Sequence, residues 1–203
     1  MGGKCFFLSP NNSGIMNKFI APSCTDNFQI ISSRFKSLGY EWHSVEQAFQ
    51  ALKFPRDSIG RMEILNTIPE KLERDENYGM RVWQLGSKRP PNFPNWVMRS
   101  DWELEKVKVM YILNLSKYAS NEILRKNLIE ITGDYDILGQ YSTPSNRHGK
   151  NWKFWNENIQ MTIRKEISIG KELYEVIEKV MGKMSGLDVE NMLIKMGFDN
   201  ENQ

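Results

Sequence analysis

The sequence predicts a mainly helical single domain with a small β element near its N-terminus. Three observations lead to this fold class. From residue 44 onward, apolar residues recur mostly at the three- and four-residue spacing of helices. Short apolar runs bounded by turn residues occur before residue 43 and once more near residue 137. The chain has 203 residues, 40% of them hydrophobic, which is enough for one sizeable core.

The overall composition narrows the class of protein. Net charge is +2, from 27 basic and 25 acidic residues, a balance that does not indicate a nucleic-acid or membrane-surface protein. Cys5 and Cys24 form neither a metal-ligand spacing nor a disulfide framework. No secretory leader and no run of roughly 18 apolar residues is found. We therefore expect a cytoplasmic protein with two free thiols and neither metal nor cofactor.

The N-terminal part is expected to supply the strands. An apolar run over residues 5–8 is closed by the turn-rich segment 9–14, and residues 16–19 carry a second apolar patch. Residues 28–35 and 40–42 flank Ser37-Leu38-Gly39, which predicts a hairpin.

Helices are predicted for most of the remaining chain. They cover residues 44–54, 59–68, 69–79, 100–118, 120–131, 152–181 with a break at Gly170, and 189–196. Ser100, with Glu103 three residues later, predicts a capped helix start. The helix that follows is expected to lie at the centre of the core, through Leu104, Val107, Met110, Tyr111 and Leu115. We predict a short strand at 135–138, a domain over 1–168, and a helical extension over 169–203 that docks on the domain or on a partner.

The helix after Ser44 carries the strongest functional signal. Ser44 is a favoured N-cap, and Gln47 completes a capping-box pattern. One face of the helix is apolar. Glu46, Gln50 and Lys53 gather on a different face, within roughly 60° of arc. On spacing alone, Glu46 is most simply a carboxylate that interacts favourably with the helix dipole.

Several ordered motifs give the chain a resemblance to a known family. They are Phe7 with a polar loop, Met16-Asn17-Lys18-Phe19, the stretch from Trp42 to Phe54, Gly79 with Arg81, Trp102 with Lys106 and Met110, and Thr132-Gly133-Asp134 with Ile137-Leu138. This order resembles the YbiA-like, or NADAR, family, named for NAD and ADP-ribose metabolism. The resemblance runs from about residue 6 to residue 165. It implies a mostly helical domain with a pocket for ribosyl compounds.

The resemblance also implies an activity, the hydrolysis of an N-glycosidic bond. Family members cleave early riboflavin-pathway intermediates or remove ADP-ribose from modified guanine in nucleic acid. Glu46 matches the catalytic carboxylate of the family. The substrate implied here is a small ribosylated nucleotide or an ADP-ribosyl compound, with ADP-ribosylated nucleic acid as a further partner.

One segment departs from the family pattern. Family members have a T-G-D-x-x-L-V-E turn, matched here by Thr132-Gly133-Asp134 with Ile137-Leu138, and they follow it with N-D-x-x-W-G. Residues 139–149 lack the Glu, the Asp and the Trp of that region. Two alternatives therefore stand beside the enzyme. One is a binding module that holds an ADP-ribose-like ligand or NAD metabolite without cleaving it. The other is a helical scaffold without a small-molecule site.

The hydrolysis of an N-riboside defines what the site residues must do. The bond breaks through an oxocarbenium-like state, which a carboxylate such as Glu46 stabilises while it activates water. A second group must protonate the leaving base, and the candidates are Asp134, Asp136 and His148. The candidate substrate-binding residues are Phe7, Lys53, Arg81, Trp102, Lys106 and Asn151. Each also has a plain structural reading: the aromatic residues as core packing, and the cations as solvated or paired groups.

Overall fold

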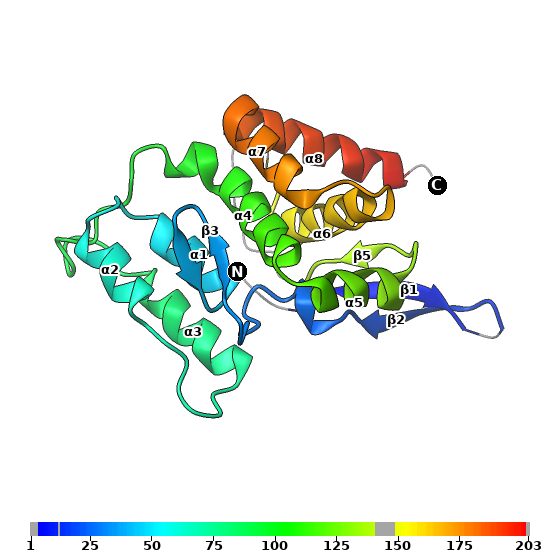
Figure 1. Ribbon diagram of the computed structural model, residues 1–203, viewed down its shortest axis with the longest axis horizontal. Coiled ribbons are helices and arrows are strands. Elements are labelled where there is room, and N and C mark those ends of the chain that lie inside the picture. The colour runs from blue at the N-terminus through cyan, green and yellow to red at the C-terminus, as the bar shows by residue number, and fades with distance from the viewer. Residues whose placement is uncertain (1–3, 12, 141–148, 202–203) are drawn as a thin grey trace.

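Two small β elements form the N-terminal part of the protein. The computed structural model describes residues 4–11, 13–140 and 149–201 (Figure 1). Strand β1 (Phe6–Pro10) pairs antiparallel with β2 (Met16–Ile20) on one side and with β5 (Ile137–Leu138) on the other. Strands β3 (Phe35–Ser37) and β4 (Tyr40–Trp42) form a separate hairpin. The short strand predicted at 135–138 is thus the third strand of the sheet.

The hairpin turn consists of Leu38 and Gly39, with φ angles of 51° and 85°. Positive φ at both turn residues matches the twist of the paired strands. The hairpin was predicted correctly, but its first strand begins at Phe35 and not near residue 28. Residues 28–34 form tertiary hydrogen bonds instead of a ladder. The N–H of Ile30 donates to Asp75 Oδ1 at 3.0 Å, and the N–H of Ile31 donates to the His43 carbonyl at 2.7 Å.

Eight α-helices are found in the described residues. They are α1 (Val45–Leu52), α2 (Ile59–Leu65), α3 (Asp75–Leu85), α4 (Trp102–Ala119), α5 (Glu122–Thr132), α6 (Trp152–Ser168), α7 (Leu173–Lys183) and α8 (Gly186–Glu201), and a short 3-10 turn η1 (Ser23–Thr25) precedes them. The predicted break at Gly170 is confirmed, since α6 ends at Ser168 and α7 begins at Leu173. The last helix is longer than the predicted 189–196.

Two predicted helix starts are wrong for physical reasons. Residues 69–74 are not helical, because Leu72 takes a left-handed conformation (φ 63°) that interrupts a helix, and α3 begins only at Asp75. Ser100 does not cap α4. The N-cap is Asp101, whose carboxylate accepts hydrogen bonds from the Arg99 guanidinium at 2.5 Å and makes no side-chain cap bond.

Helix α4 crosses the centre of the molecule (Figure 1). Helices α1, α2 and α3 lie on one side of it, and the sheet β2-β1-β5 lies with α5 and α6 on the other side. The last two helices of the chain, α7 and α8, also pack against α4. Four of the five predicted core residues of α4 are buried, whereas Leu104 is 55% exposed because it lies in the first turn of the helix. The predicted fold class, a mainly helical single domain with a small N-terminal β element, is confirmed. In the described parts of the chain, no helix has both the length and the apolar character needed to cross a bilayer.

Candidate functional site on helix α1

Helix α1 is fixed at its start by its own polar side chains. Ser44 Oγ accepts a hydrogen bond from the N–H of Gln47 at 3.0 Å, and Gln47 Oε1 accepts one from the N–H of His43 at 2.8 Å. The amide group of Gln47 also donates to the carbonyls of Ile64, Leu65 and Thr67 at the end of α2. The predicted cap therefore exists, and it ties α1 to α2.

A polar row on α1 contains the candidate carboxylate. Glu46, 0% exposed, accepts a hydrogen bond on Oε1 from Gln50 Nε2 at 2.5 Å. Gln50 Oε1 in turn accepts a hydrogen bond from Lys53 Nζ. The three residues that share a face by spacing thus form one hydrogen-bonded chain of carboxylate, amide and ammonium. We call Glu46, Gln50 and Lys53 the α1 polar row.

Charges from other elements surround the Lys53 end of the row. The pKa of Lys53 is lowered to about 8, mainly by burial and also by the charges of Arg89 and Lys106, while the Glu46 carboxylate acts in the opposite direction. Lys106 on α4 forms an ion pair with Glu103, with its Nζ 2.5 Å from Glu103 Oε2. The row therefore lies where one buried carboxylate and three cations influence one another.

Residue 86 determines how closely α3 approaches the row. A Cβ atom at Gly86 would lie 2.0 Å from Gln50 Oε1, so only glycine fits. The Gly86 carbonyl accepts hydrogen bonds from Lys53 Nζ at 3.4 Å and from Arg89 Nη1 at 2.8 Å. The chain after α3 thus brings the Arg89 guanidinium to the same carbonyl that Lys53 contacts. Arg89 was not among the predicted site residues, because nothing in the local sequence relates it to α1.

Aromatic rings pack beside the row. The Phe49 ring lies 4.9 Å from that of Trp102 and 5.2 Å from that of Trp152, between ring centroids. Trp102, at the first position of α4, is only 3% exposed. Its described contacts are those of a core residue, so stacking on a ligand remains a prediction.

A buried hydrogen-bond network supports the start of α1. The N–H of Glu46 donates to the Asn27 carbonyl at 2.8 Å, and Asn27 Oδ1 accepts a hydrogen bond from Asn114 Nδ2 at 3.2 Å. Gln160 Nε2 donates to Asn114 Oδ1 at 3.0 Å, and Tyr118 Oη donates to Gln160 Oε1 at 2.6 Å. The network joins α4 and α6 to the segment that positions Glu46. Asn27 was not identified as a site residue from the sequence. Its position between the apolar Cys24 and Phe28 is the sequence feature that indicates its burial.

The other predicted binding residues have structural partners in the described chain. Arg81 forms a two-pronged ion pair with Glu73, at 2.8 and 2.7 Å, which raises the pKa of Arg81. The ring of Phe7 stacks on that of Phe19 across strands β1 and β2, with centroids 5.5 Å apart. Asn151 is the N-cap of α6 and accepts a hydrogen bond from the N–H of Phe154 at 3.1 Å. Direct ligand contacts by these three residues remain predictions.

Two of the three candidate proton donors lie in the described part of the chain. Asp134 and Asp136 are exposed, in the segment between α5 and β5, and their charges act on Arg164. Arg164 Nη1 donates to the Tyr135 carbonyl at 2.6 Å. His148 lies outside the described residues. Among the residues that the structure describes, no group of three or more His, Cys, Asp and Glu side chains could hold a metal ion.

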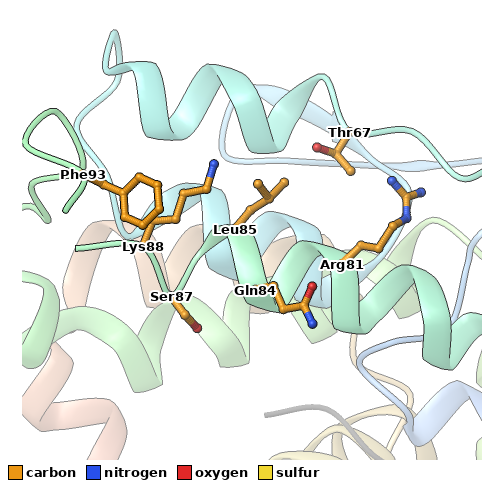
Figure 2. Close-up of a pocket in the computed structure, with 7 residues that line it drawn as sticks. All are labelled: Thr67, Arg81, Gln84, Leu85, Ser87, Lys88 and Phe93. Carbon is orange, nitrogen blue, oxygen red and sulfur yellow. The ribbon is translucent and has the colours of Figure 1, made fainter.

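A hollow of about 540 Å³ lies beside α3 and includes no residue of the α1 polar row (Figure 2). Its lining consists of Thr67, Arg81, Gln84, Leu85, Ser87, Lys88 and Phe93. Figure 2 shows Arg81 and Thr67 at one end, Lys88 and Phe93 at the other, and Leu85 between them. Both cations are paired, Arg81 with Glu73 and Lys88 with Glu63. Arg81 is the one predicted site residue in the lining of this hollow. We therefore place the candidate site at the α1 polar row because of its buried carboxylate and ammonium groups, and not because of the size of a cavity.

Comparison with known proteins supports the fold assignment. The sequence matches no family model and no curated protein sequence. The architecture places the chain in the class of mainly α domains with a small N-terminal sheet. One solved structure has a similar fold. The solution NMR structure of the Escherichia coli protein YbiA is similar over 72% of this chain and 78% of that chain, with a TM-score of 0.52 and 24% identity. At this identity the similarity shows a shared fold and does not assign an activity.

Proposed function

We propose that this protein is an N-glycosidase that hydrolyses the N-ribosyl bond of a nucleotide-like ligand, with Glu46 as the catalytic carboxylate. The observation that carries the proposal is the α1 polar row, in which a buried carboxylate is hydrogen-bonded through Gln50 to the Lys53 ammonium. The similarity of the fold to YbiA and the ordered motifs resembling the NADAR family support the same assignment.

The chemistry of the row suits an oxocarbenium-like transition state. A carboxylate in a site that excludes water stabilises positive charge at the anomeric carbon more strongly than one in bulk solvent. Glu46 can also accept the proton of the attacking water, and general-base catalysis is typically worth about 10²–10⁴-fold. Gln50 holds one carboxylate oxygen in place. Lys53 and Lys106 supply positive charge for a phosphate of the ligand or for the departing base.

The burial of Glu46 has a consequence for this proposal. Since its side chain is 0% exposed, a substrate reaches it only after the covering side chains move. This requirement favours an enzyme that opens on binding its substrate. It also gives weight to the alternative, a module that binds an ADP-ribose-like ligand without cleaving it.

Product analysis with a matched pair of variants tests the proposal. The protein is incubated with ribosylated nucleotides, early riboflavin-pathway intermediates and ADP-ribosylated DNA, and the products are identified by mass spectrometry. We expect release of ribose phosphate or ADP-ribose, and a loss of at least about 10²-fold in rate for Glu46→Gln. Glu41→Gln, which makes the same change at a half-exposed position on β4, should retain full activity.

The same experiment separates the two candidate functions. Stabilisation by ADP-ribose in a thermal-shift assay, without product from any substrate, would select the binding module. Equal turnover by wild type and Glu46→Gln would remove Glu46 from the mechanism. The absence of both turnover and stabilisation would contradict both functions.

A further inference from the structure

A second cavity lies on the far side of α4 from α1, where the C-terminal helices pack. Its volume is about 180 Å³. It is lined by Tyr111 of α4, Glu166 of α6, Lys171 and Glu172 before α7, Glu175, Val176, Lys179 and Val180 of α7, Met184, and Met192 of α8. None of these residues belongs to the α1 polar row or to the network behind it. The cavity is therefore independent of the proposed glycosidase site.

The Tyr111 hydroxyl is the unusual group in this cavity. Tyr111 is 0% exposed, and its hydroxyl has no hydrogen-bond partner among the described residues. A buried polar group without a partner typically costs about 1–3 kcal/mol, so native proteins rarely keep one without a reason. Burial raises the pKa of Tyr111, and the nearby negative charge of Glu166 raises it further. The phenol is therefore a neutral group beside a carboxylate, and its hydroxyl oxygen can accept a hydrogen bond from a ligand.

The Glu166 carboxylate already interacts with an alkylammonium group. Lys171 Nζ lies 2.5 Å from Glu166 Oε2, and the Lys171 side chain is about half exposed, at 49%. The Glu166 side chain is only 16% exposed. The cavity thus contains a carboxylate whose present partner is a half-exposed lysine at the rim, which an incoming ammonium group could replace.

The rest of the lining favours a short aliphatic chain with a second positive charge. Val176, Val180, Met184 and Met192 give apolar walls, and methionine adapts well to the shape of a ligand. Glu172 and Glu175 lie at the exposed rim, together with Lys179. With three carboxylates and two lysines in the lining, the net charge of the cavity is −1, which favours a cationic ligand. The volume is equivalent to about six water molecules, which limits the ligand to a small molecule.

We propose that this cavity binds a small aliphatic diamine. One ammonium group donates hydrogen bonds to Tyr111 Oη and to the Glu166 carboxylate, and the methylene chain contacts the valine and methionine walls. The second ammonium group lies near Glu172 and Glu175 at the rim. The lining joins α4 to α6, α7 and α8, so binding also links the C-terminal helices to the centre of the fold.

Calorimetric titration of the full-length protein with 1,4-diaminobutane tests the site. Butylamine, 1,4-butanediol and succinate serve as ligands of similar size that lack one ammonium group, lack both, or carry the opposite charge. We expect the diamine to bind more tightly than butylamine, and the diol and succinate not to bind. If the diol binds as tightly as the diamine, or if no amine binds, the proposal is wrong.

Three substitutions test the residues. Tyr111→Phe removes only the hydroxyl and should weaken diamine binding by about tenfold while the fold is retained, because that hydroxyl has no partner to lose. Glu166→Gln should weaken it by at least as much. Lys171→Met removes the competing ammonium group and should strengthen binding by up to about fivefold. A gain of affinity cannot come from misfolding, so this variant keeps the test decisive.

Matched controls separate this site from the rest of the protein. Tyr174→Phe changes an exposed tyrosine on α7, and Glu178→Gln an exposed glutamate on the same helix; neither should alter diamine affinity. Glu46→Gln should leave diamine affinity unchanged, so failure of the glycosidase proposal and failure of this one are distinguishable. Unchanged affinity in Tyr111→Phe and Glu166→Gln together would overturn the proposal.

Discussion

Lys53 shows how a single residue responds to its surroundings. Its ammonium group is buried near two other cations, and among the described residues the carboxylates of Glu46 and Glu103 act in the opposite direction. A pKa of about 8, well below the ordinary value of 10.5, follows from burial and from these neighbours. Near neutral pH the Lys53 side chain is mostly protonated. It loses its charge as the pH rises through its pKa, over about one to two pH units.

This titration predicts a pH dependence of ligand binding. If Lys53 contacts a phosphate, the affinity for ADP-ribose should be constant below about pH 8. Above that pH it should fall by up to about tenfold per pH unit as Lys53 loses its proton. Calorimetric titrations from neutral to alkaline pH measure this. Lys53→Gln should bind weakly with little pH dependence, whereas Lys36→Gln, at an exposed position of β3, should behave as wild type. A wild-type affinity that is flat through this range would remove Lys53 from the ligand site.

At the scale of elements, the close contact between α3 and α1 depends on Gly86. An alanine there would place its Cβ 2.0 Å from Gln50 Oε1 and 2.8 Å from Gln50 Cβ. Gln50 is buried and hydrogen-bonded on both sides, so it cannot move without breaking the α1 polar row.

We therefore predict that Gly86→Ala lowers both stability and activity. Overpacking of this kind typically costs about 1–3 kcal/mol, which thermal or urea unfolding measures. Gly182→Ala in α7 is the matched control, because its added Cβ would meet no described atom within 4 Å apart from the neighbouring backbone of its own helix. That control should raise the free energy of unfolding by about 0.4–1 kcal/mol, since alanine favours the helix. Equal stability of Gly86→Ala and wild type would show that α3 can withdraw from α1 at no cost.

The elements also show which features the sequence can reveal. The start of α1 was predicted because Ser44 and Gln47 satisfy the helix end locally. The start of α3 was not, because Leu72 takes a left-handed conformation and Asp75 accepts a hydrogen bond from the N–H of Ile30, 45 residues away in the chain. The α1 polar row follows from helical spacing alone. Its neighbours Asn27, Gly86 and Arg89 come from other segments, and only the packed structure brings them to α1.

At the scale of the whole molecule, the C-terminal helices share the core of the domain. Leu173, Val180, Val189 and Leu193 are buried in the same cluster as Met110 of α4. Lys108 Nζ of α4 donates to the Met184 carbonyl at 2.6 Å. A Cβ at Gly186 would lie 1.9 Å from the Leu104 carbonyl oxygen, so the start of α8 touches the backbone of α4. The division into a domain over 1–168 and an extension over 169–203 remains a prediction, and this packing gives it a direct test.

Deletion of residues 169–203 should prevent stable folding of the remainder. Burying an apolar side chain of this size is worth about 1.5–3 kcal/mol, so the four residues together approach the whole stability of a typical domain, about 5–15 kcal/mol. Circular dichroism and thermal unfolding of residues 1–168 measure the effect. Within the full chain, Leu193→Ala should cost about 2–5 kcal/mol, and Leu187→Ala, at an exposed position of the same helix, less than about 0.5 kcal/mol. A cooperative transition of 1–168 at the temperature of the full chain would instead show that the C-terminal helices are an appendage, and that α4 keeps its core without them.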